Sequence, residues 1–100
     1  MIKHIVMWKL QEDVEGKSKA ESAKIIKDSL EGLKGKVDEI IDIEVGINLN
    51  PSEQAYDVVL YSTFKTMDDL NTYQKHPEHL NVATFVRKAA CSRVVVDYEV

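Results

Sequence analysis

The stretch Ile2–Leu10, with the sequence IKHIVMWKL, decides the fold. Alternate residues of a β-strand point to opposite faces of its sheet, and here both alternating sets are apolar at the centre. One set contains His4 and Trp8, and the other contains Ile5 and Met7. A strand that is apolar on both faces needs cover on both faces. We therefore predict a strand with helices against one face and a further protein layer against the other.

Start and stop signals place the remaining elements along the chain. Ser18 and Glu21 have the spacing of a capping box, which starts a helix. Thr66 is a suitable N-cap for a second helix. Pro77 suits the first position of a third, because the residue before a proline is pushed out of the helical region. The expected elements are a polar loop over 11–17, helices over 18–33, 66–75 and 77–88, a loop over 48–52, and strands over 39–47, 56–64 and 91–99.

Apolar spacing predicts which side of each element is buried. In the first helix the apolar side consists of Ala23, Ile26, Leu30, Leu33 and Val37. In strand 39–47 the alternation groups Ile41, Ile43, Val45 and Ile47 on one face. In the third helix the apolar side consists of Leu80, Val82, Ala83 and Val86.

The order of these elements is βαββαβ, with the second helical region broken at His76-Pro77. This is the ferredoxin-like split βαβ pattern, an α+β fold in which helices cover one face of an antiparallel sheet. The simplest cover for the other apolar face is a second copy of the chain, since most oligomers are homomers. We expect one domain over residues 1–100 and a sheet-on-sheet homodimer that closes, or nearly closes, into a dimeric α/β barrel.

Composition excludes several classes of function. The chain has 100 residues, 13 basic and 17 acidic side chains and a net charge of −4, so a general nucleic-acid partner is not expected. Arg87 and Arg93 are the only arginines. No apolar run has the length of a membrane span, and the start lacks signal-peptide features. The single cysteine, Cys91, forms no internal disulfide and is expected to be a buried filler, so we expect a cytoplasmic protein without a membrane partner.

The candidate catalytic residues lie on elements that the topology brings together. Strand 91–99 pairs antiparallel to the first strand, so Asp97 should lie near His4. His76 and His79 flank the helix break, and Tyr73 precedes it by one turn. A histidine held by a carboxylate can act as a base near neutral pH, and a tyrosine phenol can donate to a developing oxyanion. These groups suit proton abstraction next to a carbonyl or an aldol-type ring closure.

Each of these residues also has a structural alternative. His4 could be a hydrogen-bonded core histidine, His76 a helix terminator, His79 a surface residue, Tyr73 a packing residue and Asp97 an exposed acid. The His-x-x-His spacing lacks a clear third ligand, so no metal site is expected. No glycine-rich phosphate loop or nucleophile elbow is present, and we expect no cofactor.

The chain resembles the stress-responsive dimeric α/β-barrel (Dabb) family over essentially its whole length, and three segments carry this resemblance. They are residues 3–10 (KHIVMWKL), residues 73–79 (YQKHPEH) and residues 96–98 (VDY). The resemblance implies a ferredoxin-like protomer, a barrel-forming homodimer and a small pocket between sheet and helices. One plant branch of the family is a polyketide cyclase with a His/Tyr acid–base pair. The match assigns those roles to His79 and Tyr73, with His4 and Asp97 in support.

The expected function is therefore that of a homodimer that binds a small apolar or aromatic molecule, with acid–base chemistry of the polyketide cyclase type. We expect His4, Val6, Trp8 and His76 to line the ligand pocket. One alternative is a non-catalytic stress-response or structural dimer, in which the histidines hold the helix break to the sheet. A further alternative is a cofactor-free small monooxygenase, because related dimeric barrels include such enzymes.

Overall fold

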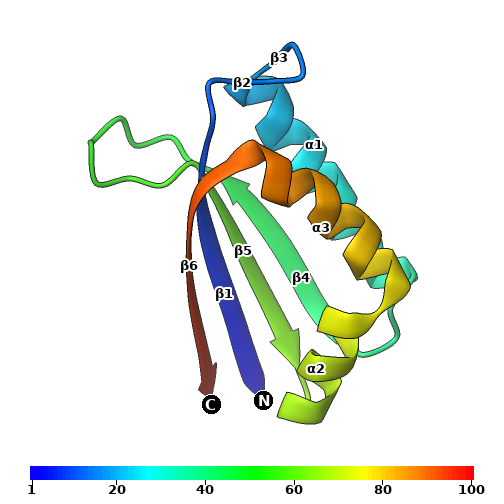
Figure 1. Ribbon diagram of the computed structural model, residues 1–100. Coiled ribbons are helices and arrows are strands. Elements are labelled where there is room, and N and C mark those ends of the chain that lie inside the picture. The colour runs from blue at the N-terminus through cyan, green and yellow to red at the C-terminus, as the bar shows by residue number, and fades with distance from the viewer.

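The computed structural model describes residues 1–100, and its elements follow the expected order (Figure 1). The strands are β1 (Ile2–Leu10), β2 (Asp13–Val14), β3 (Lys17–Ser18), β4 (Ile40–Ile47), β5 (Val58–Phe64) and β6 (Ala90–Glu99). The helices are α1 (Lys19–Glu31), the 3-10 turn η1 (Gly32–Gly35), α2 (Met67–Lys75) and α3 (Pro77–Ala89). A helix that could span a membrane is not found among them.

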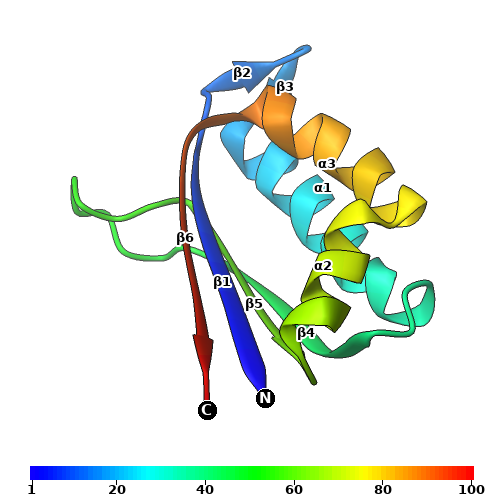
Figure 2. The ribbon, with the colours of Figure 1, turned by 60° about the horizontal axis from the view of Figure 1, so that its bottom comes forward.

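The main sheet is antiparallel and has the strand order β4-β5-β1-β6, so β1 and β5 are central. Both ribbon views place α1, α2 and α3 on one side of this sheet and no helix on the other (Figures 1 and 2). The predicted ferredoxin-like α+β fold, with its helices on one face, is confirmed.

The helices begin where the sequence predicts. The Ser18 side chain accepts from the Glu21 backbone N–H, and the Glu21 carboxylate accepts from Ser18 N–H, which completes the capping box. His76 separates α2 from α3, and its Nδ1 accepts from the Glu78 backbone N–H at 3.1 Å. Pro77 occupies the first turn of α3, where no intrahelical bond from its nitrogen is needed.

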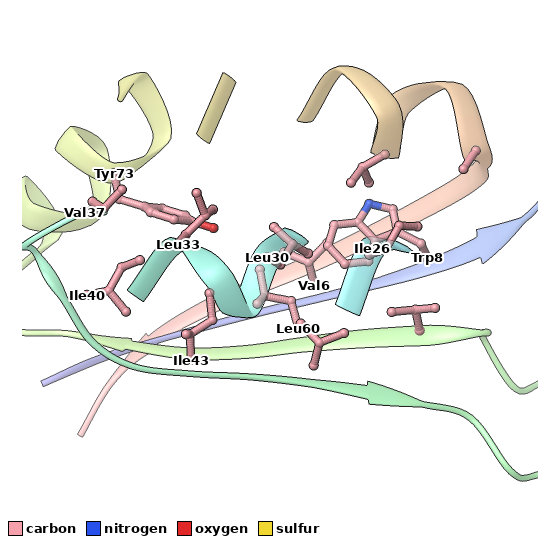
Figure 3. Close-up of a cluster of buried hydrophobic side chains, with 14 of the residues drawn as sticks. Val6, Trp8, Ile26, Leu30, Leu33, Val37, Ile40, Ile43, Leu60 and Tyr73 are labelled. Carbon is pink, nitrogen blue, oxygen red and sulfur yellow. The ribbon is translucent and has the colours of Figure 1, made fainter. Parts of the chain in front are cut away.

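The core lies between the sheet and the helices (Figure 3). The expected apolar side of the first helical segment is buried in full, from Ala23 to Val37. Figure 3 shows Tyr73 at one end of this cluster and Trp8 at the other. The expectation for α3 was wrong at Leu80, which is exposed, because α3 reaches the core mainly through Val86 and Ala89.

Local backbone irregularities account for two further differences. The 11–17 segment contains a small β2–β3 hairpin instead of a plain loop, and its turn residues Glu15 and Gly16 both have positive φ, as a tight hairpin turn requires. The β4 ladder shifts register between Ile40 and Asp42. Ile40 is therefore buried while Ile41 is exposed, contrary to the simple alternation.

The opposite side of the sheet has an apolar centre that no element of the chain covers. We call this the open sheet face; the register pairs place on it Ile5, Met7, Val59, Tyr61, Val94, Val96 and Tyr98. Met7, Tyr61, Val94, Val96 and Tyr98 are all exposed. Cys91, expected to be buried, is also exposed, because it lies on the edge strand β6, one residue after its start at Ala90. Contiguous exposed apolar surface of this kind marks an interaction site.

Candidate functional site

His4 and Asp97 face each other across the β1–β6 ladder, as the topology predicts. His4 is 3% exposed, whereas the Asp97 side chain is 31% exposed, and His4 Nδ1 is hydrogen-bonded to Asp97 Oδ1. Because an ionised carboxylate only accepts, His4 Nδ1 is the donor of this hydrogen bond. The pair thus fixes the orientation of a buried histidine.

Four aromatic rings form a continuous cluster beside this pair. The centroid of Tyr73 lies 4.4 Å from that of His79, 5.0 Å from that of Phe64 and 6.4 Å from that of His4. Tyr73 therefore stands between His4 of the sheet and His79 of α3. The fold brings together four of the predicted site residues: His4, Tyr73, His79 and Asp97.

His79 is held as a neutral imidazole. Its Nδ1 lies 3.1 Å from the Gln74 carbonyl oxygen, which can only accept, so Nδ1 donates and Nε2 keeps its lone pair. Burial lowers the pKa of His79, and nearby His4, Arg87 and Arg93 lower it further. The Gln74 hydrogen bond acts in the opposite direction. A half-buried imidazole with a lowered pKa is unprotonated at neutral pH and can accept a proton.

Tyr73 is held as a hydrogen-bond donor without a partner. The whole residue is buried, and its hydroxyl oxygen has no hydrogen-bond partner in the protein. Burial raises the pKa of this phenol, because the phenolate would be poorly solvated. The hydroxyl therefore stays protonated, and it is free to donate to an acceptor that reaches it.

A cavity of about 340 Å³ adjoins this cluster. It is lined by Trp8, Leu30, Leu60, His79, Ala83, Val86, Arg87, Ala90 and Arg93. These residues come from β1, α1, β5, α3 and β6, so the cavity lies between the sheet and the helices. Its size and mainly apolar wall are those of a site for a small organic molecule.

Not every residue expected at the pocket lines this cavity. Trp8 and His79 line it, whereas His4, Val6, His76 and Tyr73 do not. Val6 is in the core, and His76 caps α3 through its Nδ1. Its position before a proline, at a helix start, is the signal for that capping role.

Sequence reasoning missed Arg87 and Arg93 as site residues. Positions 79, 83 and 87 are four apart and lie on one side of α3, which brings Arg87 to the same cavity as His79. Arg93 is the direct cross-strand partner of Trp8 and shares its face of the sheet. The one feature of the sequence that could have pointed to them is that they are the only two arginines of the chain.

Comparison with known families and structures gives several matches. The Stress responsive A/B Barrel Domain family matches residues 2–100. A dimeric protein of unknown function with a ferredoxin-like fold from Bacteroides fragilis NCTC 9343 is 38% identical, with a TM-score of 0.89 and coverage of 99% of this chain and 95% of that chain. Comparison with curated proteins gives no match.

Two more distant structures share the fold. A hydroxynitrile lyase from Passiflora edulis is 19% identical, with a TM-score of 0.83 and coverage of 99% of this chain and 92% of that chain. A protein from Nitrosomonas europaea described as a candidate antibiotic biosynthesis monooxygenase is 18% identical, with a TM-score of 0.78 and coverage of 100% and 98%. At this identity the likeness concerns the fold and carries no activity over.

The resemblance expected from the three sequence segments is confirmed over nearly the whole chain. The family match starts at β1 and runs through β6, and the Bacteroides fragilis structure agrees with it in fold. This chain belongs to the Stress responsive A/B Barrel Domain (Dabb) family.

Proposed function

We propose that this protein is a homodimer that binds a small apolar or aromatic carbonyl compound in the cavity between α3 and the sheet and removes a proton next to its carbonyl group. The observation that carries this proposal is the position of His79. It lines the cavity, and its Nδ1 hydrogen bond to Gln74 leaves Nε2 as a neutral base.

The proposed step is a proton transfer that balances without a cofactor. The carbon–hydrogen bond next to the carbonyl breaks, its proton moves to His79 Nε2, and its electron pair moves onto the carbonyl oxygen as an enolate. The Tyr73 hydroxyl lies outside the cavity wall, behind His79, so the carbonyl end of the ligand would have to extend past His79 to this otherwise unpaired group, which would then donate to the enolate oxygen. Attack of the enolate carbon on a second carbonyl would form the new carbon–carbon bond of an aldol-type ring closure of the polyketide cyclase type, and the resulting alkoxide would take the proton back from His79 Nε2.

His4 and Asp97 would act as positioning residues in this scheme. Neither lines the cavity, but the His4 ring is 6.4 Å from the Tyr73 ring between centroids. Asp97 fixes the orientation of His4 through its hydrogen bond. The pair therefore forms the sheet-side support against which Tyr73 is placed.

The second part of the proposal is that two copies associate through the open sheet face. The Bacteroides fragilis relative is described as dimeric, and the centre of this face in our chain is apolar and exposed. The rim carries Lys3, whose Nζ lies 5.2 Å from the Tyr61 ring centroid and donates to Thr63. An apolar centre within a polar rim is the usual anatomy of a protein interface.

The test uses propiophenone in deuterium oxide, with the exchange of its α-protons followed by proton NMR. We expect wild-type protein to accelerate exchange over buffer, His79→Gln to abolish the acceleration and Tyr73→Phe to reduce it. Lys75→Gln, a substitution at an exposed α2 residue outside the cavity wall, is the matched control. Exchange at the buffer rate with wild-type protein, or equal acceleration by His79→Gln, would contradict the proposed chemistry.

A non-catalytic dimer is the second candidate, and one observation favours it. The His79 hydrogen bond to Gln74 ties α3 to α2, so the histidine already has a structural role. This candidate predicts that His79→Ala lowers the free energy of unfolding by about 1–3 kcal/mol while the exchange rate of propiophenone stays at the buffer value. Urea unfolding of ligand-free protein, measured beside the exchange assay, separates the two candidates.

A further inference from the structure

We infer that the cavity is selective for an apolar molecule that carries a carboxylate, and that Arg87 and Arg93 bind this carboxylate. The inference deepens the proposed function, because it rests on the same cavity being a ligand site. The observation that carries it is the meeting of both arginines of an acidic chain at one apolar cavity.

The two guanidinium groups reach the cavity from different elements. Arg87 lies two helical steps of four residues after His79 on α3, and Arg93 lies on β6 opposite Trp8. Residues far apart in the sequence, such as Leu30 and Arg93, thus line one cavity. A carboxylate bound between α3 and β6 could be contacted by one arginine from each side. Each guanidinium can donate two parallel hydrogen bonds to a carboxylate.

The charges at this cavity are of one sign. Its lining includes the cations Arg87 and Arg93 beside the neutral His79, but no aspartate or glutamate, although the chain has 17 acidic residues. None of the ion pairs of the protein involves either arginine. Neither side chain forms a hydrogen bond to another residue of the chain, so all their donors are available to a ligand. Burial is the main cause of the lowered pKa of His79, and both arginines add to it in the same direction.

The remaining wall defines the rest of the ligand. Trp8, Leu30, Leu60 and Val86 offer no charged group, so the body of the ligand should be apolar or aromatic. Arg87 and Arg93 are themselves exposed, so the carboxylate would lie at the mouth of the cavity while the carbon skeleton enters along this wall. A carboxylate at the arginines and a carbon skeleton along Trp8 would satisfy both parts of the cavity.

A purely structural role does not explain both arginines. A cation in the last turn of a helix interacts favourably with the negative end of the helix dipole. In α3 Lys88 already supplies such a cation, so Arg87 is not needed for this role. Lys88 has an ion-pair partner in Glu15, at 4.0 Å, and does not line the cavity. Arg93 lies in a strand, where the dipole argument does not apply. Lys88 is therefore a matched control for the loss of one positive charge near Arg87.

The test compares hydrocinnamate with hydrocinnamyl alcohol, which share a skeleton and differ in charge. Binding to the intact protein is measured by isothermal titration calorimetry and by the fluorescence of Trp8, the only tryptophan. We expect hydrocinnamate to bind at least about tenfold more tightly than the alcohol. Arg87→Gln and Arg93→Gln should each remove most of this preference without changing the affinity of the alcohol, and Lys88→Gln should keep it.

Three outcomes would overturn the inference, and they differ in what they say of the proposed function. Equal binding of both probes by wild-type protein would remove the carboxylate preference but leave the cavity as a ligand site. A preference that Lys88→Gln weakens as much as Arg87→Gln would assign it to overall charge instead of to the two arginines. Failure of both probes to bind in the millimolar range would count against the inference and against the ligand site itself.

Discussion

His4 and Asp97 are 93 positions apart in the chain, yet they are direct cross-strand partners on β1 and β6 and share a hydrogen bond. This hydrogen bond links the first strand of the chain, β1, to the last strand, β6. It also leaves a buried imidazole dependent on one partly exposed carboxylate, because no other side chain is bonded to the His4 ring.

Replacement of Asp97 should therefore destabilise the protein more than its partial exposure indicates. Asp97→Ala leaves the Nδ1 proton of a buried histidine unpaired, which costs about 1–3 kcal/mol in the free energy of unfolding. Urea unfolding at neutral pH measures this difference. Glu99→Ala, two residues along the same exposed strand and with no side-chain partner, is the control and should change the free energy by less than about 0.5 kcal/mol. Equal effects of the two substitutions would show that the hydrogen bond contributes no stability.

Tyr73→Phe should leave the stability of the ligand-free protein unchanged or raise it. The hydroxyl is buried without a partner, so its removal breaks no hydrogen bond and relieves the cost of an unsatisfied group. Tyr73→Ala instead removes the ring that packs against Phe64 and His79, and should cost about 3–5 kcal/mol. Urea unfolding of the three proteins tests both statements. A loss of more than about 1 kcal/mol in Tyr73→Phe would indicate a hydrogen-bond partner for the hydroxyl.

The fold could be predicted from the sequence because its helix starts, helix ends and buried faces are each encoded by residues close together in the chain. The Ser18 capping box, the proline after His76 and the helical spacing from Ala23 to Val37 each depend on residues within a few turns. The β-bulge at Ile41 could not be predicted, because a bulge depends on how β4 meets β5. The hairpin at Glu15 was missed because positive φ at a non-glycine residue leaves little mark in the sequence.

Part of the candidate site could likewise be predicted from the sequence, and part of it could not. The His4–Asp97 contact could be predicted, because antiparallel pairing of the first and last strands fixes which residues oppose each other. The cavity wall could not, because Leu30, Arg87 and Arg93 meet only through the packing of α1, α3 and β6. His76 was expected at the pocket for its proximity in sequence to His79, but its side chain caps α3.

The stability of the protein should depend on pH through His79. Burial is the main cause of its lowered pKa, and His4, Arg87 and Arg93 face it and act in the same direction. The unfolded chain, in which this pKa returns to about 6.5, then binds a proton that the folded protein does not. The free energy of unfolding should therefore fall as the pH drops through 6.5, until the folded histidine is protonated too.

His79→Gln tests this pH dependence, because it removes the titrating group. Urea unfolding of wild type and variant between about pH 5 and pH 7.5 should give a steeper decline with falling pH for the wild type. The difference between the two proteins should therefore be largest above pH 6.5 and shrink below it. Parallel curves over this range would mean that His79 titrates alike in the folded and unfolded chains.

Two adjacent valines of β6 can decide whether the open sheet face forms the dimer. Val96 lies on this face beside Ile5, whereas Val95 lies on the helix-side face beside Val6. Both are exposed in the single chain, at 57% and 44%, so a charge at either position is tolerated by the protomer itself. Val96→Lys places an ammonium group in an apolar interface, where it would be buried without a counter-charge, and should shift the protein from dimer to monomer.

Val95→Lys is the control, because it adds the same charge to the same strand and should leave the dimer intact. Sedimentation equilibrium of the two variants at equal concentration measures this contrast. A dimer that survives Val96→Lys and dissociates with Val95→Lys would place the interface on the other side of β6, and association through the open sheet face would then be wrong.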